Sequence, residues 1–288
     1  MQKINFPTFG PGGNSEAFAL AGKKSSTQAP EWIKSIGLDA YEFEAGRGIN
    51  ASEAVLAEIG EQAKRHGVLM SFHTPYFISL SSVEEEKRTN SIEYIRRSLA
   101  ASELLGADTI VIHTGSAAKI TREQAMKLAS DTLERNLLVN GDTSIRMGLE
   151  TMGKLNQLGT LEEVIELCKI SPKYHPVVEF GHLNARYVGG YFPDCDSYRR
   201  IFDKIACELG DDYAYNLHCH FSKIEFTEKG EKQHLTFSDS VYGPDFEPLA
   251  EAIIREGVCP RIICESAGTQ SDDALAMKQM WLSAGGKA

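Results

Sequence analysis

The sequence lacks three features that would each point to a class of protein. No apolar run in its 288 residues approaches the ~18 residues that a membrane-spanning helix needs, so we expect no membrane partner. Its six cysteines contain no CxxC pair, which argues against a thiolate metal site and gives no disulfide framework. The N-terminus has no apolar core of a secretory signal, so we expect a cytoplasmic protein.

Positive charge is also scarce. The sequence has 30 Lys and Arg residues against 40 Asp and Glu residues, which gives a formal net charge of −10 at pH 7. Nonspecific binding of nucleic acid depends on neutralising phosphates with Lys and Arg, so this balance counts against a broad affinity for DNA or RNA. It is still compatible with one basic groove on an otherwise acidic surface. On charge alone, a small molecule is the simplest substrate.

What the sequence does contain is a repeated unit, in which a charged helical stretch ends at a glycine and a short apolar run follows at once. Glycine suits the residue after a helix because a left-handed backbone costs it little. The unit occurs at least five times, with glycines at Gly37, Gly67, Gly106, Gly210 and Gly257. Helix starts are marked by capping boxes or near matches: Thr121 with Gln124, Thr160 with Glu163, and Asn50 with Glu53.

The apolar runs are short and rich in Val, Ile, Phe and Tyr, which predicts buried parallel strands. They lie near residues 3–9, 38–43, 68–73, 108–113, 145–150, 175–180, 213–220 and 260–265. Eight alternations of strand and helix predict an α/β fold, a single (β/α)8 TIM barrel that spans residues 1–288 as one domain. A doubly wound open sheet is the alternative, but GPGG at 10–13 lacks the GxGxxG spacing expected there, so we interpret it as a turn.

Six of the eight predicted strands end in a residue that can bind metal or move a proton. They are His73, His113, Glu150, Glu179, His218 and Glu265. One such residue alone is most often a satisfied polar group of the core, but six at one barrel rim are not explained that way. Converging carboxylates repel, so they need protons or divalent cations. Nitrogen and oxygen donors favour Zn²⁺, with Mn²⁺ or Fe²⁺ also compatible, and six candidates favour two ions bridged by one carboxylate.

Three further histidines lie near this predicted rim. His182 follows the sixth strand by three residues, and His234 lies in the long loop after the seventh strand, so both add to the predicted site. His220 alternates with His218 and therefore faces the same side of that strand. We expect His220 to lie behind the ligands rather than among them.

Together these motifs resemble the endonuclease IV family of abasic-site DNA repair nucleases, within the wider xylose isomerase-like barrels. The likeness spans nearly the whole chain and rests on SFHTPYFISL, VIHTGS, GLET, EFGH, NLHCHFSK, KQH and CES. It implies a monomer whose cluster of two or three zinc ions hydrolyses the phosphodiester bond 5′ to an abasic site. The implied partner is damaged double-stranded DNA, in base excision repair.

The resemblance also implies a ligand set shared among three zinc ions. Glu150 would bridge the first and second ions and, like Glu265, is a candidate for orienting the attacking water. The implied sets are His73, His113 and Glu150 for the first ion, Glu150, Glu179, His218 and Glu265 for the second, and His182 with His234 for the third.

DNA contacts follow from the same resemblance. Tyr76 and Phe77 match the positions at which the family inserts side chains into the DNA stack at the lesion. Arg47 matches a wedge arginine on a looser alignment. Three basic residues in loops of the catalytic face are further candidates for phosphate contacts: Lys154, Arg186 and Lys223.

Two departures from the family bear on the metals. Glu179 stands where the family has Asp, and its longer side chain still ligates but shifts the ion. Lys232 stands where the family has an Asp two residues before the last histidine, and an ammonium group has no acceptor for a metal. The third ion therefore needs Glu231 or Asp239 as a substitute, or the site holds two ions.

Two other functions stay open at this stage. A sugar isomerase or epimerase on the same barrel would use one metal and two glutamates that shuttle a proton, which suits the acidic charge. It leaves His73, His113 and His234 unexplained, because a single ion does not need them. Its ligands would be Glu150, Glu179, His218 and Glu265. A binding protein that has lost catalysis is the other alternative, and Lys232 is its only support.

Overall fold

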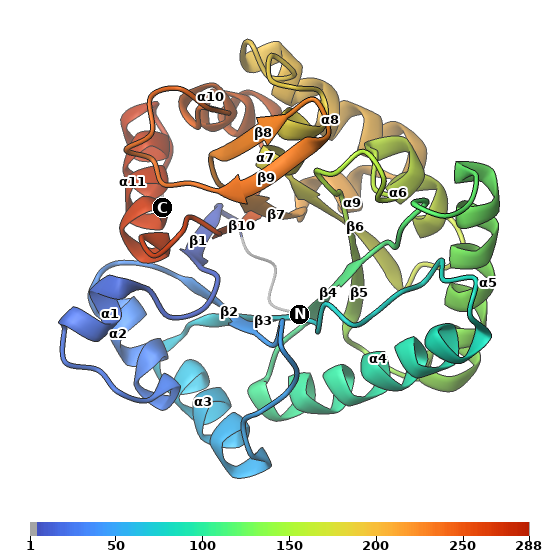
Figure 1. Ribbon diagram of the computed structural model, residues 1–288. Coiled ribbons are helices and arrows are strands. Elements are labelled where there is room, and N and C mark those ends of the chain that lie inside the picture. The colour runs from blue at the N-terminus through green and yellow to red at the C-terminus, as the bar shows by residue number, and fades with distance from the viewer. Residues whose placement is uncertain (1–4, 288) are drawn as a thin grey trace.

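The computed structural model describes residues 5–287 and shows eight parallel strands curved into a barrel (Figure 1). Along the sheet the strand order is β1-β10-β7-β6-β5-β4-β3-β2, and each neighbouring pair is parallel. The predicted TIM barrel is confirmed. The barrel strands are β1 Thr8–Pro11, β2 Ala40–Glu44, β3 Leu69–His73, β4 Thr109–His113, β5 Arg146–Glu150, β6 Tyr174–Glu179, β7 His218–Phe221 and β10 Arg261–Cys264.

The ring closes where β1 lies against β2. A parallel bridge between Gly12 and Glu42 joins the two strands. The backbones come so close here that a Cβ atom on Gly10 would lie 1.8 Å from the carbonyl oxygen of Ala40, so this position requires glycine. This seam completes the barrel and brings β2 into the wall of its mouth, by which we mean the end of the barrel at which the strands finish.

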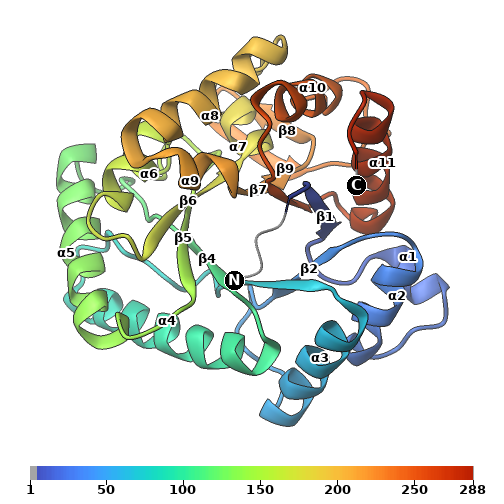
Figure 2. The ribbon, with the colours of Figure 1, turned by 180° about the vertical axis from the view of Figure 1, so that it is seen from behind.

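Helices surround the barrel on its outside (Figures 1 and 2). Thr121 and Thr160 form the predicted capping boxes, and Gly67, Gly106 and Gly257 end their helices in the left-handed conformation. None of the described helices is long and apolar enough to cross a membrane. The helices are α1 Glu16–Leu20, the 3-10 helix η1 Ser26–Gln28, α2 Ala29–Ser35, α3 Glu53–His66, α4 Glu85–Leu105, α5 Arg122–Asn140, α6 Leu161–Cys168, α7 Phe180–Arg186, α8 Cys195–Leu209, α9 Asp211–Tyr215, α10 Glu247–Glu256 and α11 Gln270–Ser283.

Two local predictions near the N-terminal half are wrong. The first strand covers Thr8–Pro11 instead of 3–9, so GPGG supplies its first two residues to the strand and is not a turn after it. The predicted residues 3 and 4 lie outside the described part of the chain. Helix α3 is capped by Ser52, whose side chain accepts a hydrogen bond from the helix, and not by Asn50.

The long connection after β7 folds into an antiparallel hairpin of β8 (Ile224–Thr227) and β9 (Gly230–His234). The hairpin lies in front of the barrel strands in Figure 1 and behind them in Figure 2. It is on the face of the barrel that holds the carboxyl ends of the strands. Its pairing is irregular, because Lys232 is an extra residue opposite the junction of Glu225 and Phe226. A β-bulge of this kind changes which side chains of a strand share a face.

The opposite end of the barrel, which we call the base, carries paired charges. Arg261 begins β10 and donates hydrogen bonds of 2.8 Å to both carboxylate oxygens of Asp108, the residue before β4. Arg146 lies 3.4 Å from the same carboxylate. Burial raises the pKa of Asp108, but the two arginines outweigh it and hold that pKa well below its usual value.

Candidate metal centre

Three neighbouring strands place their last residues together at the mouth. His73, His113 and Glu150 end β3, β4 and β5, and His113 is in register with Glu150. The Oε2 atom of Glu150 lies 3.1 Å from Nε2 of His113 and 3.6 Å from Nε2 of His73. This oxygen is buried and has no hydrogen-bond partner. The three side chains therefore face a common point, as the ligands of one cation do.

Two histidines are held in the orientation that ligation needs. Nδ1 of His73 lies 3.0 Å from the carbonyl oxygen of Thr74, which accepts the proton of that nitrogen and leaves Nε2 facing Glu150. Nδ1 of His182 lies 2.9 Å from the carbonyl oxygen of Thr151 in the same way. Acceptors behind histidine ligands are usual at metal sites, because they fix the tautomer and the ring.

A second group of donors lies beside the first. Nδ1 of His220 lies 3.2 Å from Oε1 of Glu150 and 3.3 Å from Oε1 of Glu265. Glu179, His234 and Glu265 form another group, with one ligand atom from each within 4.8 Å of the others. Glu150 and Glu265 thus each belong to two groups, which is the arrangement of bridging carboxylates.

The third group contains His182, Glu231 and His234. Nε2 of His182 lies 3.4 Å from Oε2 of Glu231. Residues three apart on a regular strand face opposite sides, but the bulge at Lys232 turns Glu231 and His234 to the same side. Glu231 therefore supplies the acceptor that Lys232 cannot.

Lys232 and Asp239 take no part in this group. Nζ of Lys232 lies 2.6 Å from Oε1 of Glu225 at the exposed side of the hairpin. The carboxylate of Asp239 accepts hydrogen bonds from the backbone N–H groups of Val241 and Tyr242. The group around His182 thus has its acidic member in Glu231, without Lys232.

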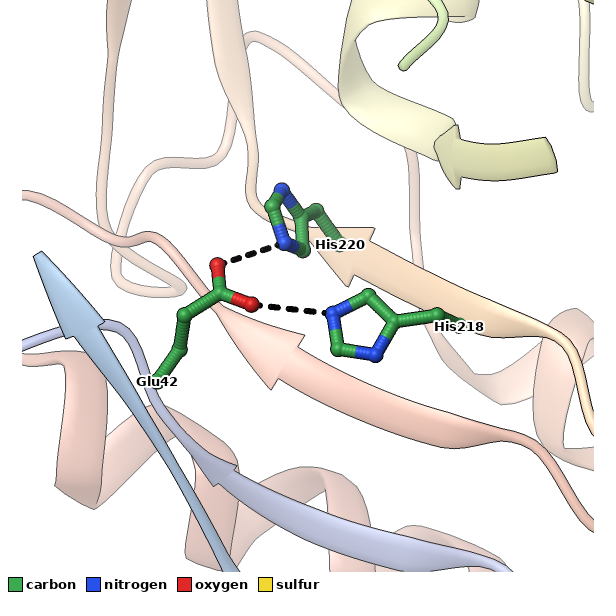
Figure 3. Close-up of side chains that lie close together, drawn as sticks. All are labelled: Glu42, His218 and His220. Carbon is green, nitrogen blue, oxygen red and sulfur yellow. Dashed lines mark hydrogen bonds and ion pairs between the residues drawn. The ribbon is translucent and has the colours of Figure 1, made fainter. Parts of the chain in front are cut away.

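His218 differs from its predicted place. Residues 211–215 form α9 instead of the start of a strand, so β7 begins at His218 and this residue lies deep in the barrel. Its Nε2 atom lies 3.0 Å from Oε2 of Glu42 (Figure 3). His220, two residues further on and expected behind the ligands, lies at the mouth in register with Glu179 and takes the place predicted for His218.

Two glutamates of β2 are absent from the predicted site. Glu42 and Glu44 alternate along the strand and therefore face the same side, into the barrel. Glu42 is fully buried between His218 and His220, and Oε1 of Glu44 is buried without a hydrogen-bond partner. The signal in the sequence is the pair of glutamates in AYEFE, since a strand covered on both faces normally excludes charge.

Burial and the histidines act on the carboxyl groups of the mouth in opposite directions. Burial raises the pKa of Glu44 and of Glu179 to about 8. At Glu42 and Glu150 the neighbouring histidines outweigh burial and hold the pKa well below its usual value. Burial lowers the pKa of His73, but Glu44 and Glu150 outweigh it and raise that pKa to about 10. Protons on histidines can thus supply the positive charge that the mouth requires.

The donor set fits divalent cations. It offers imidazole nitrogens and carboxylate oxygens without thiolates, the mixture that suits Zn²⁺ and also Mn²⁺ or Fe²⁺. Three buried atoms of the mouth lack a hydrogen-bond partner: Oε1 of Glu44, Oε2 of Glu150 and Nε2 of His220. Buried polar atoms rarely stay unsatisfied, and an ion would engage Oε2 of Glu150 directly. The residues present therefore fit a centre of two or three cations.

Aromatic and basic side chains lie at the rim beside this centre. Tyr76 and Phe77 follow β3 and are 60% and 53% exposed. The ring of Tyr76 stacks on His113 with 5.3 Å between centroids. Arg47 is exposed and, with Tyr76 and Glu265, lines an open pocket of about 520 Å³. Tyr76 and Arg47 thus line the rim beside the candidate centre.

The three basic loop residues differ in their availability. Lys154 is half exposed at the mouth. Arg186 is buried, and its guanidinium donates hydrogen bonds to four backbone carbonyls between residues 152 and 157. Lys223 is mostly buried, donates to a backbone carbonyl and lies 3.2 Å from Asp245. Arg186 and Lys223 therefore hold loops in place and are not available to a phosphate.

A family model and curated relatives match this chain. A family model described as xylose isomerase-like TIM barrel matches residues 30–283. An uncharacterised protein of Methanocaldococcus jannaschii is 28% identical over 91% of this chain and 95% of its own length. A probable endonuclease 4 of Acholeplasma laidlawii is 29% identical over 53% of this chain and 52% of its own length, so that match spans about half of each protein.

Solved structures share the fold. The crystal structure of a D-tagatose 3-epimerase-like protein has a TM-score of 0.71 and 20% identity and covers 96% of both chains. Endonuclease IV from Thermus thermophilus has the same TM-score of 0.71 with 18% identity, covering 96% of this chain and 99% of that one. Fold similarity alone does not choose between these two activities. The match of the family model over most of the chain shows that it belongs to the xylose isomerase-like TIM barrel family, as a divergent member related to the endonuclease IV proteins.

Proposed function

We propose that this chain is a zinc-dependent hydrolase that cleaves damaged double-stranded DNA 5′ to abasic sites, as an endonuclease of base excision repair. The observation that carries the proposal is the set of ligand groups that share residues at the mouth. Two histidines meet Glu150 on one side, and two more meet Glu231 on the other. One cation does not use so many ligands, whereas neighbouring ions suit displacement at a phosphate.

Divalent cations bound at these residues would supply water activation at neutral pH and charge neutralisation at the phosphate. The side chains themselves do the positioning. Glu150 and Glu265, each shared by two ligand groups, can accept a hydrogen bond from the attacking water and so set its direction. His73 and His182 are already oriented by backbone carbonyls, so the centre needs little rearrangement.

Selectivity for an abasic site would come from the rim. A nucleotide without a base costs little to turn out of the duplex, because no stacking or pairing is lost. Tyr76 and Phe77 are exposed beside the centre and can fill the gap that is left. Arg47 and Lys154 supply positive charge for the backbone at a mouth that is otherwise acidic.

The direct test is incubation of the purified chain and Zn²⁺ with a duplex that carries one abasic site, next to the same duplex without the lesion. We expect a single cut 5′ to the site, lost on chelation and restored by Zn²⁺. Tyr76→Ala should weaken binding about 5-fold or more, since stacking contributes roughly 1–3 kcal/mol, and should leave the metal content unchanged. An abasic duplex that stays intact at stoichiometric enzyme and saturating Zn²⁺ contradicts the proposal.

A sugar isomerase or epimerase is the second candidate, and the open pocket favours it. The pocket of about 520 Å³ is lined by polar side chains that suit sugar hydroxyls, including Glu44, Asn50 and Gln270. In this case one cation would be held at Glu150, Glu179 and Glu265, with His220 in the place predicted for His218. The test is incubation of a ketose with the chain and Mn²⁺ or Zn²⁺, and the measurement is formation of the product sugar. Turnover of the ketose would favour this activity over the nuclease.

A further inference from the structure

One buried cluster lies just beneath the proposed metal centre and shares one residue, His220, with its ligand groups. It consists of Glu42 from β2 and His218 and His220 from β7, and all three side chains are at most 5% exposed (Figure 3). Oε2 of Glu42 lies 3.0 Å from Nε2 of His218, and Oε1 lies 2.8 Å from Nε2 of His220. The carboxylate is thus held between two imidazole rings.

His220 connects this cluster to the mouth. Its Nδ1 atom faces Glu150 and Glu265 at 3.2 and 3.3 Å, while its Nε2 atom faces Glu42. A histidine that binds a metal through one nitrogen usually donates the proton of the other nitrogen to a carboxylate, which fixes the tautomer and makes the ligand more basic. Glu42 is in the place of that carboxylate.

The partners of Glu42 point to the same role. Among residues 5–287 its ion pairs are with the two histidines and not with a lysine or arginine. The partly buried acid at the base differs in this respect, because Asp108 is paired with Arg261. A glutamate fully buried beneath a set of ligands, with imidazoles as its partners, is costly to keep unless it serves those ligands.

The contact with His220 is close but not yet aligned. Oε1 of Glu42 and Nε2 of His220 lie 2.8 Å apart without the geometry of a hydrogen bond. The contact of His218 with Oε2 does have that geometry. We expect a cation at Nδ1 of His220 to turn the ring and complete the second hydrogen bond.

We propose that Glu42 is a positioning residue, which holds His220 so that its Nδ1 binds a divalent cation together with Glu150 and Glu265, while His218 holds Glu42. This inference rests on the proposed metal centre but not on DNA as the substrate. It gives a function to a residue pair, Glu42 and His218, that the ligand groups of the mouth do not require.

Glu42→Gln is the sharpest test, because it keeps the volume of the side chain. The amide retains one acceptor oxygen and presents N–H donors to the other histidine. If these donors face His220, its proton moves from Nε2 to Nδ1, the nitrogen that should bind the cation. We expect the affinity for Zn²⁺, measured by competition with a chromophoric chelator, to fall about 10–100-fold. The visible spectrum of the Co²⁺ form should also change, since it reports the geometry and nitrogen ligands of the ion.

Asp108→Asn is the matched control, since it removes a carboxylate at the base that contacts no candidate ligand. It should lower the melting temperature but leave the Zn²⁺ affinity and the Co²⁺ spectrum as in the wild type. If Glu42→Gln folds poorly, circular dichroism measures the fraction that is folded. The Zn²⁺ affinity of that fraction then gives the same comparison.

Two results would overturn the inference. Wild-type affinity and an unchanged Co²⁺ spectrum in Glu42→Gln would mean that Glu42 does not act on His220. Loss of one whole equivalent of ion at saturation, with the other affinities unchanged, would make Glu42 itself a ligand of a separate inner ion. Abasic DNA left intact by a chain that binds Zn²⁺ in a Glu42-dependent way would remove the proposed substrate and leave this inference standing.

Discussion

At the base of the barrel the carboxylate of Asp108 lies between two arginines, whereas at the mouth Glu44, Glu150 and Glu179 lie among histidines and one another. The negative charge of Asp108 at the base is neutralised without any ligand, because guanidinium groups are always charged. The negative charge of the mouth is neutralised only while its imidazoles carry a proton, because they lose their positive charge when that proton leaves. Carboxylates paired with arginines at one end support the fold, and carboxylates paired only with histidines at the other leave room for cations.

The largest effect in this comparison should come from Glu150→Gln. Oε1 and Oε2 of Glu150 lie within 3.6 Å of four histidines, so the change removes an anionic bridge from two ligand groups. We expect a loss of Zn²⁺ content and of DNA cleavage beyond the about 10–100-fold seen when a residue behind a ligand is changed. Metal analysis and the cleavage assay measure both. Retention of full metal content would break the contrast between mouth and base.

The pH dependence of stability should have opposite signs at the two ends. Glu44 and Glu179 have folded pKa values of about 8, above the usual 4.5, so the folded state keeps protons that the unfolded chain loses. His73, with a pKa of about 10 against 6.5, acts in the same direction. Their stabilisation is therefore lost as the pH rises, while that of Asp108, whose pKa is lowered, is lost as the pH falls below about 4.

For the metal-free chain we therefore expect the free energy of unfolding to fall from pH 6.5 to pH 8. Urea unfolding in a chelator at these two pH values measures it. Bound Zn²⁺ should reduce the slope, because cations replace the protons. A stability that rises with pH in the chelator would show that the mouth does not hold these protons.

Asp108→Asn should have a smaller effect, and only on stability. Breaking a buried ion pair costs about 3–5 kcal/mol, but this carboxylate is partly exposed, so we expect roughly 2 kcal/mol. Denaturant unfolding of the metal-loaded chain checks this value. A change in Zn²⁺ content in this variant would mean that the two ends are coupled through the strands.

Lys232→Ala should have the smallest effect. Its ammonium lies on the exposed side of the hairpin with Glu225, and exposed ion pairs contribute little to stability. Metal content should stay as in the wild type, whereas Glu231→Ala should lose up to one equivalent of ion. Equal metal losses in the two variants would place the third group elsewhere.

The barrel was predictable from the sequence because its signals are local. Glycines after helices, capping boxes and short apolar runs each act within a few residues, and the last residues of β3, β4 and β5 follow from the strand ends. β7 was less accessible, since the Tyr-rich segment before His218 has the composition of a strand but forms α9. This shift explains why His220 and not His218 lies at the mouth.

The other differences depend on contacts that no local pattern contains. The burial of Arg186 follows from four carbonyls of a loop some 30 residues earlier in the chain, and a lone arginine in a rim loop gives no sign of it. The partners of Glu42 lie 176 and 178 positions away, as read from Glu42, His218 and His220 in the sequence. Such pairings exist only once the barrel has closed.

The extra residue in β9 has a consequence for recognising relatives of this chain. A search for an acidic residue two positions before the histidine of this hairpin meets Lys232 and discards the sequence. The backbone absorbs the added residue and brings Glu231 within 3.4 Å of His182. Spacing rules for this motif should therefore accept an acidic residue either two or three positions before the histidine.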